Sequence, residues 1–218
     1  MQRIEKILNH TENYALLITP GKVQEVVIGV PHHAPLGVGH LPCKEHPYAD
    51  ENAGLVGYEL ARLLNCRSII ACNSPIDPNK HRDSKYCQKI LAWQPMFLVE
   101  IHGHGGVSAK FDIEISSGSS TKNFWSKEMA KRLRTKLSAI PLLHGYTLSG
   151  DINEIYFKAK KSFTITSNEW IAFHIELPKS IRASNDVYSL FCVSLAETIR
   201  ELLASYDELL EVQNKNPG

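Results

Sequence analysis

The stretch VVIGVPHHAP, Val26 to Pro35, joins two signals within ten residues. Its first half is apolar and β-branched apart from one glycine, which is typical of a strand buried in a parallel sheet. Two adjacent histidines, His32 and His33, then follow between two prolines. In open α/β sheets, ligands bind at the carboxyl ends of the strands. We therefore expect this pair of imidazoles to belong to a functional site.

Short apolar runs of the same kind recur along the chain and alternate with helical patterns. Strands are expected at residues 25–30, 68–72, 96–101 and 172–177, and helices at 50–65, 85–93, 122–137 and 184–212. This alternation predicts an α/β fold, a three-layer α/β/α arrangement around a mostly parallel mixed sheet. The 218 residues contain no linker or internal repeat, so we expect a single domain over residues 1–218.

Composition and charge exclude several classes of protein. Lys plus Arg is 24 and Asp plus Glu is 23, a balance that argues against binding nucleic acid through phosphate neutralisation. No apolar run approaches the roughly 20 residues needed to cross a bilayer. The first residues carry charges where a signal peptide has an apolar core, so a cytoplasmic location without a membrane partner is expected. The oligomeric state is not predicted.

Polar side chains follow the other expected strands as well. His102 and His104 come after residues 96–101, Glu176 ends residues 172–177, and the acidic pair Asp50 and Glu51 opens the helix after the first strand. Two imidazoles and one carboxylate at one sheet edge suit a single Zn²⁺ ion with an open position for water. A second carboxylate nearby is placed to take a proton from that water. From the residues alone, each histidine pair and the acidic pair remain open as to which member binds the metal.

Competing interpretations were weighed against this one. The turn His104-Gly105-Gly106 is similar to the glycine-rich oxyanion loop of lipase-type esterases, but the G-x-S-x-G nucleophile elbow of that fold is absent. The sequence also contains no P-loop and no G-x-G-x-x-G fingerprint, so nucleotide phosphates are not indicated. His40 and His46, in the long segment after the first strand, are interpreted as surface loop residues.

The order of motifs resembles a known family. VPHH, YADENAG, IDPNK, VEIHGHGG and HIELPKSIR follow one another between Val26 and Arg182 as in N-formylglutamate amidohydrolases and their relatives. That family belongs to the zinc-carboxypeptidase-like group with a phosphorylase/hydrolase-like fold, to which aspartoacylase-type deacylases are related. The resemblance implies a zinc-dependent amide hydrolase.

The resemblance also implies roles for individual residues. Pro31-His32 matches the family's strand-end motif, and Glu100-Ile101-His102-Gly103 is similar to its D-x-H-S turn, which favours His32 and His102 as zinc ligands. The acidic position matches Asp50 or Glu51, and we take Glu51 as the third ligand. His174-Ile175-Glu176 looks like the family's Q-I-E segment and makes Glu176 the expected general base. The cationic side chains expected to anchor a substrate carboxylate are Lys80, Arg82 and Arg182.

These inferences lead to a zinc-dependent hydrolase that cleaves an amide bond in a small carboxylated substrate. A carboxypeptidase or peptide amidase of the same fold, acting on short peptides, is the first alternative. A non-catalytic metal-binding protein with the same fold is the second. A protein without metal, with its histidines in surface loops, is the third.

Overall fold

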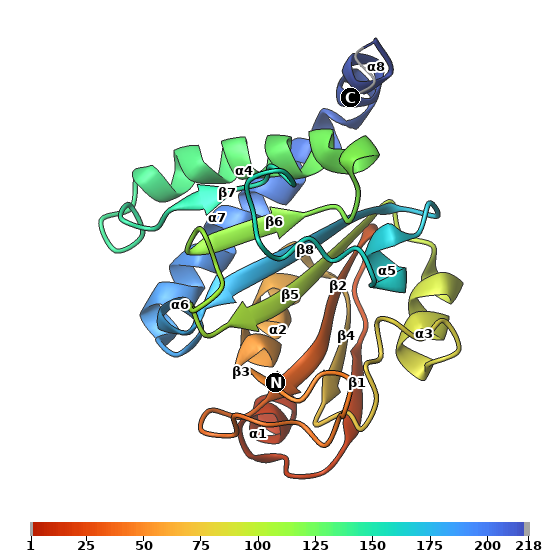
Figure 1. Cartoon of the computed structure of the whole chain (residues 1–218), viewed down its shortest axis with the longest axis vertical. Coiled ribbons are helices and arrows are strands. Elements are labelled where there is room, and N and C mark those ends of the chain that lie inside the picture. Colours follow the sequence, from red (N-terminus) through yellow and green to blue (C-terminus); the bar gives the residue numbers. More distant parts are fainter. Residues whose placement is uncertain (1, 216–218) are drawn as a thin grey trace.

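The computed structural model describes residues 2–215, and its strands within that range form one eight-stranded sheet (Figure 1). The order is β1-β4-β2-β5-β8-β6-β7, with β3 paired to β2 outside this path. The strands are β1 (Ala15–Thr19), β2 (Val23–Ala34), β3 (Asp50–Glu51), β4 (Cys66–Cys72), β5 (Phe97–His104), β6 (Ile113–Ser116), β7 (Leu148–Ser149) and β8 (Ile171–Pro178).

The helices lie between the strands in sequence and on both faces of the sheet. They are α1 (Gln2–His10), α2 (Ala53–Leu64), α3 (Lys85–Trp93), α4 (Asn123–Ser138), α5 (Phe163–Thr166), α6 (Lys179–Arg182), α7 (Asn185–Ala204) and α8 (Tyr206–Lys215). Pairing is parallel for β2 with β3, β4 and β5, for β5 with β8 and for β6 with β7. Among the strand pairs of residues 2–215, β1–β4 and β6–β8 alone are antiparallel. The predicted three-layer α/β/α fold with a mostly parallel mixed sheet is confirmed.

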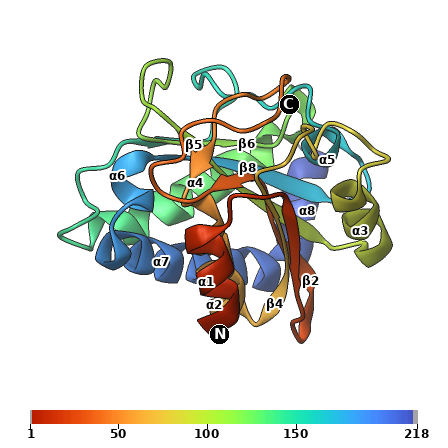
Figure 2. The same cartoon turned by 90° about the horizontal axis from the view of Figure 1, so that it is seen from below.

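The two faces of the sheet differ in what covers them. Helices α2, α4 and α7 pack on one face, whereas α3 and α5 lie on the other (Figures 1 and 2). On the second face, Leu98 and Ala172 pack in the apolar cluster near α3 and α5. Because side chains alternate along a strand, the same face carries Glu100 and His102 on β5 and Glu176 on β8. The apolar packing therefore gives way to buried polar groups toward the carboxyl ends of these strands.

Strand β2 runs further than the sequence indicated, to Ala34 rather than Val30. Its pairing with β4 shifts register between Val30 and His33, where three steps along β2 correspond to two along β4. One extra residue reverses the alternation of side chains. Val30 and His33 consequently both face α2, and His32 turns toward the opposite face, where β5 carries His102.

Two expected helix boundaries were wrong. Asp50 and Glu51 do not open a helix but pair with His33 and Ala34 as the short parallel strand β3. Helix α2 begins only at Ala53, after Asn52 in a left-handed conformation (φ 65°). The expected long helix over residues 184–212 divides into α7 and α8 around Ser205. No helix in the described range is both long enough and apolar enough to span a membrane.

Candidate metal centre

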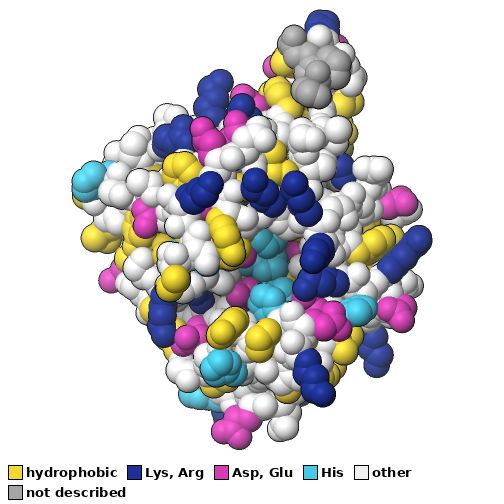
Figure 3. Space-filling view, in the orientation of Figure 1, with side chains coloured by type: hydrophobic (Ala, Val, Ile, Leu, Met, Phe, Trp, Pro, Cys, Tyr) yellow, Lys and Arg dark blue, Asp and Glu magenta, His cyan; other side chains and the backbone are white. Residues whose placement is uncertain are grey.

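Four histidine side chains lie in a row at the carboxyl ends of the central strands. The ring of His46, from the loop at residues 35–49, stacks on His32 with centroids 3.7 Å apart. His32 lies 5.2 Å from His102, and His102 lies 4.1 Å from His174 of β8. Figure 3 shows histidine and acidic side chains together near the centre of this face. Residues from β2, β5, β8 and one loop thus lie side by side at this edge of the sheet.

The carboxylate of Asp50 lies between two of these rings. Its Oδ2 atom is 3.5 Å from His32 Nδ1 and 3.2 Å from His102 Nδ1. All three residues are almost fully buried. Strand β3 places Asp50 here, because β3 pairs with the end of β2 and this pairing sets Asp50 beside His33.

A different carboxylate contacts the far nitrogen of each of these two imidazoles. His32 Nε2 is 2.9 Å from Asp77 Oδ1, and His102 Nε2 is 3.3 Å from Glu100 Oε2. Metal-binding histidines commonly donate their second ring N–H to a carboxylate, which orients the ring and leaves the other nitrogen free for the metal. The arrangement around His32 and His102 has this form.

Glu100 is itself held by two further hydrogen bonds. Asn79 Nδ2 donates to Oε2 and the Tyr86 hydroxyl donates to Oε1, both over 3.0 Å. Gly29 of β2 makes room for this contact, since a β-carbon there would lie 2.2 Å from the Tyr86 hydroxyl oxygen. Gly29 therefore leaves the space in which Tyr86 holds Glu100, the carboxylate that contacts His102.

The charges in the pocket favour a cation. Burial would lower the pKa of His102, but the adjacent carboxylates of Asp50 and Glu100 raise it to about 10. Burial would raise the pKa of Asp50, but His102 and His32 hold it far below its usual range. The space between Asp50 and the two rings is thus favourable for positive charge.

Glu176 occupies the other side of the cluster. Its Oε1 atom is 3.5 Å from His174 Nε2 on the same strand. Burial raises the pKa of Glu176 to about 8, against the opposing charge of His102. Burial also lowers the pKa of His174 well below 6.5, so this ring is neutral.

The residues present fit a divalent metal ion. His32 Nδ1, Asp50 Oδ2, His174 Nδ1 and Glu176 Oε2 are buried and have no hydrogen-bond partner among the described residues. Zinc bonds of 2.0–2.2 Å place two ligands of a tetrahedral site about 3.3–3.5 Å apart. The separations of 3.2 Å and 3.5 Å around Asp50 Oδ2 match that value. Ligand atoms also lie within 4.8 Å of one another in two groups: His32, His46 and Asp50, and His102, His174 and Glu176.

The second member of each histidine pair binds backbone instead. His33 Nε2 donates to the Leu8 carbonyl over 2.9 Å, and His33 Nδ1 accepts from Gly54 N over 3.0 Å. His104 Nε2 lies 2.9 Å from the Asp112 carbonyl, and its Nδ1 accepts from Gly106 N. The structure therefore brings His32 and His102 to the cluster and uses His33 and His104 to hold loops and helices.

Glu51 does not join the cluster, in contrast to its expected role as the third ligand. Its carboxylate accepts from Lys179 Nζ over 3.1 Å and from Gly37 N over 2.8 Å, on the rim of the site. Adjacent residues of a strand point to opposite sides, so only one of Asp50 and Glu51 can face the rings. The structure gives that position to Asp50, the alternative in the sequence interpretation.

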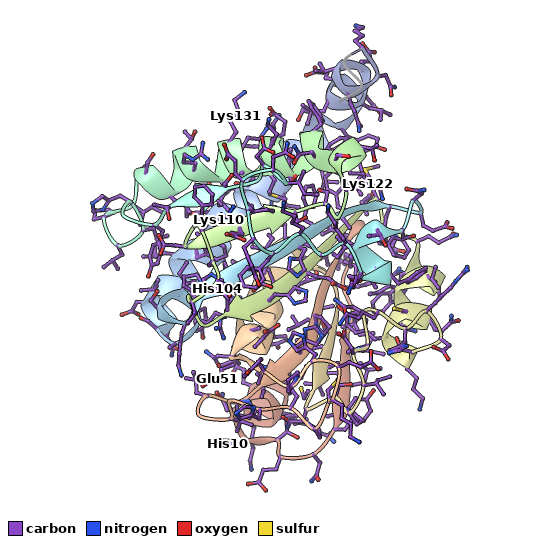
Figure 4. All side chains as sticks on the ribbon, in the orientation of Figure 1. His10, Glu51, His104, Lys110, Lys122 and Lys131 are labelled. Carbon is purple, nitrogen blue, oxygen red and sulfur yellow. The ribbon has the colours of Figure 1, made fainter. Side chains whose placement is uncertain are left out.

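The three expected carboxylate anchors have other partners. Lys80 Nζ forms an ion pair with Asp77 Oδ2, and the exposed Arg82 lies over the Phe163 ring at 5.5 Å. The buried Arg182 donates to the carbonyls of Glu51, His104 and Leu177. Figure 4 shows Glu51 and His104 at the same sheet edge, which Arg182 ties together. A role of these cations in substrate binding stays a prediction.

A cavity of about 620 Å³ opens beside the cluster. Asp50, Glu176 and His46 lie on its inner side, and its outer walls include residues 103–108 and Phe157. Glu114 joins the segment that follows residues 103–108 to the segment that contains Phe157. Its carboxylate accepts hydrogen bonds from the backbone N–H groups of Lys110 and Phe111 in one segment and of Tyr156 and Phe157 in the other. A ligand in this cavity would reach Asp50 and Glu176 directly.

Sequence reasoning missed several residues of this site. His46 was interpreted as a surface residue, and His174, Asp77 and Glu100 were given no part in holding a metal. Asp77 and Glu100 lay within the motifs IDPNK and VEIHGHGG. The alternation Glu100-x-His102 and His174-x-Glu176 was the available signal, because residues two apart in a strand share a face.

Comparison with known proteins places the fold. The sequence matches no protein-family model and no curated protein. Gene product Atu2144 from Agrobacterium tumefaciens has a similar structure (TM-score 0.56, 12% identity, 88% of this chain and 94% of that one). A bacteriophage poly-γ-glutamate hydrolase is also similar (TM-score 0.55, 14% identity, 95% of this chain and 96% of that one). The catalytic domain of CwlV, an N-acetylmuramoyl-L-alanine amidase from Bacillus (Paenibacillus) polymyxa var. colistinus, is similar as well (TM-score 0.52, 14% identity, 83% of this chain and 98% of that one).

Proposed function

We propose that the chain is a metal-dependent hydrolase of amide bonds, with one zinc ion held by His32, Asp50 and His102. The observation that carries the proposal is the paired arrangement of the two imidazoles. Each turns Nδ1 toward Asp50 Oδ2, and each has its Nε2 beside a separate buried carboxylate. The names of two proteins of similar fold, an amidase and a poly-γ-glutamate hydrolase, describe the cleavage of amide bonds and support the same reaction class.

Glu176 is the proposed general base. When bound, a zinc ion supplies a Lewis acid that polarises the amide carbonyl and acidifies water. A nearby cation favours the carboxylate form of Glu176, so its burial does not prevent it from accepting a proton. His174, 3.5 Å away, positions the carboxyl group. Glu176 takes the proton of the attacking water and delivers it to the leaving amine.

The proposed substrate is an amide bond within a longer peptide-bearing chain, rather than in a small carboxylated molecule. Lys80, Arg82 and Arg182, the expected carboxylate anchors, are engaged by Asp77, Phe163 and backbone carbonyls. The cavity of about 620 Å³ next to Glu176 is lined by glycines, aromatic rings and carboxylates, together with the cations Lys179 and Arg182. Muramoyl-peptide and poly-γ-glutamate chains, the substrate types named for the similar proteins, are the chemistries to examine first.

The test combines metal content with hydrolysis. Purified protein is assayed for zinc stoichiometry and for cleavage of muramoyl-peptides, poly-γ-glutamate, short peptides and N-formylglutamate. We expect His102→Ala to lose zinc and Glu176→Gln to keep zinc but lose activity. Glu169→Gln, at an exposed position just before β8, is the matched control and keeps both. Full zinc in His102→Ala, or full activity in Glu176→Gln, would contradict the assignment. Bound zinc without cleavage of any substrate would favour a non-catalytic metal-binding protein.

A further inference from the structure

We infer that three lysines beside the metal centre, Lys158, Lys160 and Lys161, bind the carboxylates of an acidic chain that crosses the site. They lie within four consecutive residues, 158–161, which form the lysine segment. This inference rests on the proposed function and deepens it. It identifies the longer substrate chain as an acidic one, with carboxylate groups on the residues that flank the amide bond.

The lysine segment begins over the strand next to the histidine cluster. The Ser116 hydroxyl of β6 donates to the Lys158 carbonyl over 2.8 Å, and Ser116 is paired with His174 of β8. Directly opposed residues of an antiparallel pair point to the same face of a sheet, so Lys158 lies over the face that carries His174. Phe157, the residue before the segment, is part of the cavity wall. A chain that leaves the cavity past Phe157 therefore meets the lysines next.

The other end of the segment is fixed to the support of His102. The Asn79 carbonyl accepts from Thr164 N over 3.2 Å and from the Ser162 hydroxyl over 3.4 Å. The side chain of Asn79 donates in turn to Glu100, the carboxylate that contacts His102. The lysine segment thus spans from the strand beside the cluster to the loop that supports the cluster.

The backbone of the segment turns its lysines outward. Ala159 has a left-handed conformation (φ 49°), and its methyl group packs against the apolar cluster near α3 and α5. Ser162 N donates to the Ala159 carbonyl over 3.2 Å and closes the turn. Lys160 and Lys161 are consequently exposed, and Lys158 is half-buried. The three ammonium groups can be reached by a ligand on the surface.

The charge of the segment is not balanced by neighbouring carboxylates. None of its three lysines forms an ion pair within residues 2–215. Lys80 and Lys179, by contrast, pair with Asp77 and Glu51. Residues 155–168 contain no Asp or Glu. Figure 3 shows Lys and Arg side chains near the histidines on this face. Such a local excess of one sign attracts and concentrates ligands of the opposite sign.

The position of the lysines favours an acidic amide chain over a nucleic acid. The whole chain carries a net charge of only +1, so it lacks the broad positive surface that phosphate neutralisation requires. The lysines instead adjoin the cavity that contains Glu176, the proposed base for amide hydrolysis. A chain with its amide bond at Glu176 and its carboxylates on the lysines satisfies both features.

The test measures binding in the Glu176→Gln background, in which cleavage is not expected. The probe is fluorescein-labelled deca-L-glutamate, followed by fluorescence anisotropy. Each exposed ion pair contributes a factor of about 1.4–5 to a binding constant, so loss of all three should weaken binding by about 3- to 100-fold. The variant is Lys158→Gln/Lys160→Gln/Lys161→Gln. Three exposed lysines on α1, before β2 and on α4 give a control of equal charge, Lys6→Gln/Lys22→Gln/Lys131→Gln.

The control variant should bind the probe as the parent does. Arginine at all three positions of the segment should also preserve binding, which separates the role of charge from an effect on folding. Salt should weaken binding, because the screening length falls from about 10 Å at 0.1 M to 3 Å at 1 M.

Equal weakening in the two glutamine variants would reduce the effect to net charge and overturn the inference. Equally tight binding of a neutral Gly-Ser peptide, or tighter binding of an oligothymidylate of the same length, would also overturn it. A parent that does not bind deca-L-glutamate would do so too, while leaving the proposed metal site and hydrolysis intact. Binding of the probe by a chain that cleaves no amide would instead count against the proposed function alone.

Discussion

The imidazole of His32 and the carboxylate of Asp77 are joined through Nε2 and Oδ1 over 2.9 Å, although 45 positions separate them in the chain. Burial would raise the pKa of Asp77, but His32 and Lys80 lower it far below its usual range, so it is a carboxylate. A buried carboxylate on the far nitrogen fixes the ring and makes the near nitrogen a better metal ligand.

We expect Asp77→Asn to weaken zinc binding by about 10–100-fold while the protein remains folded, because an amide accepts the same hydrogen bond without the charge. Competition with a chelator measures the effect. Asp83→Asn makes the same change at an exposed position of the same loop and should have no effect. Equal zinc affinity in the two variants would show that Asp77 does not support the metal site.

The sequence predicted which strands carry the site, because their apolar runs end in polar residues. Val26–Val30 and the apolar parts of β5 and β8 are buried and continuous, so their ends were visible as the points where His32, His102 and Glu176 follow. Parallel strands then bring these ends to one edge. The edge could therefore be predicted without knowing the contacts across it.

The choice within each pair depends on local register, which hydrophobic periodicity does not reveal. The family resemblance favoured His32 and His102, the two histidines that face the cluster, but it left Asp50 and Glu51 open. The extra residue of β2 between Val30 and His33 decides that His32, not His33, faces the cluster. Asp50 replaces Glu51 because residues 50–51 form a strand instead of a helix start. His46 and Asp77 lie in irregular loops, where hydrophobic periodicity gives no information on the direction of a side chain.

Gly29→Ala should destabilise the protein through Tyr86. The new β-carbon would lie 2.2 Å from the Tyr86 hydroxyl oxygen, so this side chain must move and its hydrogen bond to Glu100 is lost. We expect a loss of about 1–3 kcal/mol in the free energy of unfolding, as for other overpacked cores. Urea denaturation measures it, with Gly145→Ala as control because a β-carbon there has no neighbour within 4 Å.

The double variant Gly29→Ala/Tyr86→Phe gives a stricter comparison. Removing the hydroxyl frees the space that the alanine needs, so adding Gly29→Ala to Tyr86→Phe should cost less than adding it to the wild type. Equal costs in the two backgrounds would show that the clash with Tyr86 does not limit this position.

The stability of the metal-free protein should fall as the pH is lowered, in part because of His33. Burial lowers the pKa of His33 to about 4, whereas the unfolded chain has the ordinary value of 6.5. Between these values the unfolded state binds a proton that the folded state does not, so stability is complete above pH 6.5 and declines toward pH 4. From pH 7 to pH 5 this histidine alone should account for a loss of about 2 kcal/mol.

Urea denaturation in chelator at the two pH values, for the wild type and His33→Gln, isolates this contribution. The variant should be less stable at pH 7, since its side chain cannot reproduce both contacts with Leu8 and Gly54. It should also lose less stability on going to pH 5, while the contributions of the other histidines remain in both proteins. The same loss in both would assign the pH dependence to groups other than His33.

Glu114→Gln should loosen the two walls of the cavity together. The carboxylate accepts from Lys110 N at 2.7 Å, Tyr156 N at 2.9 Å and Phe157 N at 2.8 Å, with Phe111 N at 3.3 Å. An amide keeps one oxygen and turns N–H groups toward the other two donors, so two charge-assisted hydrogen bonds are lost at about 1.5–3 kcal/mol each.

For Glu114→Gln we expect faster hydrogen exchange in residues 105–112 and 155–158, while β2 and β5 remain protected. Glu154→Gln is the control, because the carboxylate of Glu154 accepts a hydrogen bond from the Ser149 hydroxyl and from no backbone N–H within residues 2–215. If exchange accelerates equally throughout the sheet, Glu114 supports the core as a whole rather than the cavity walls.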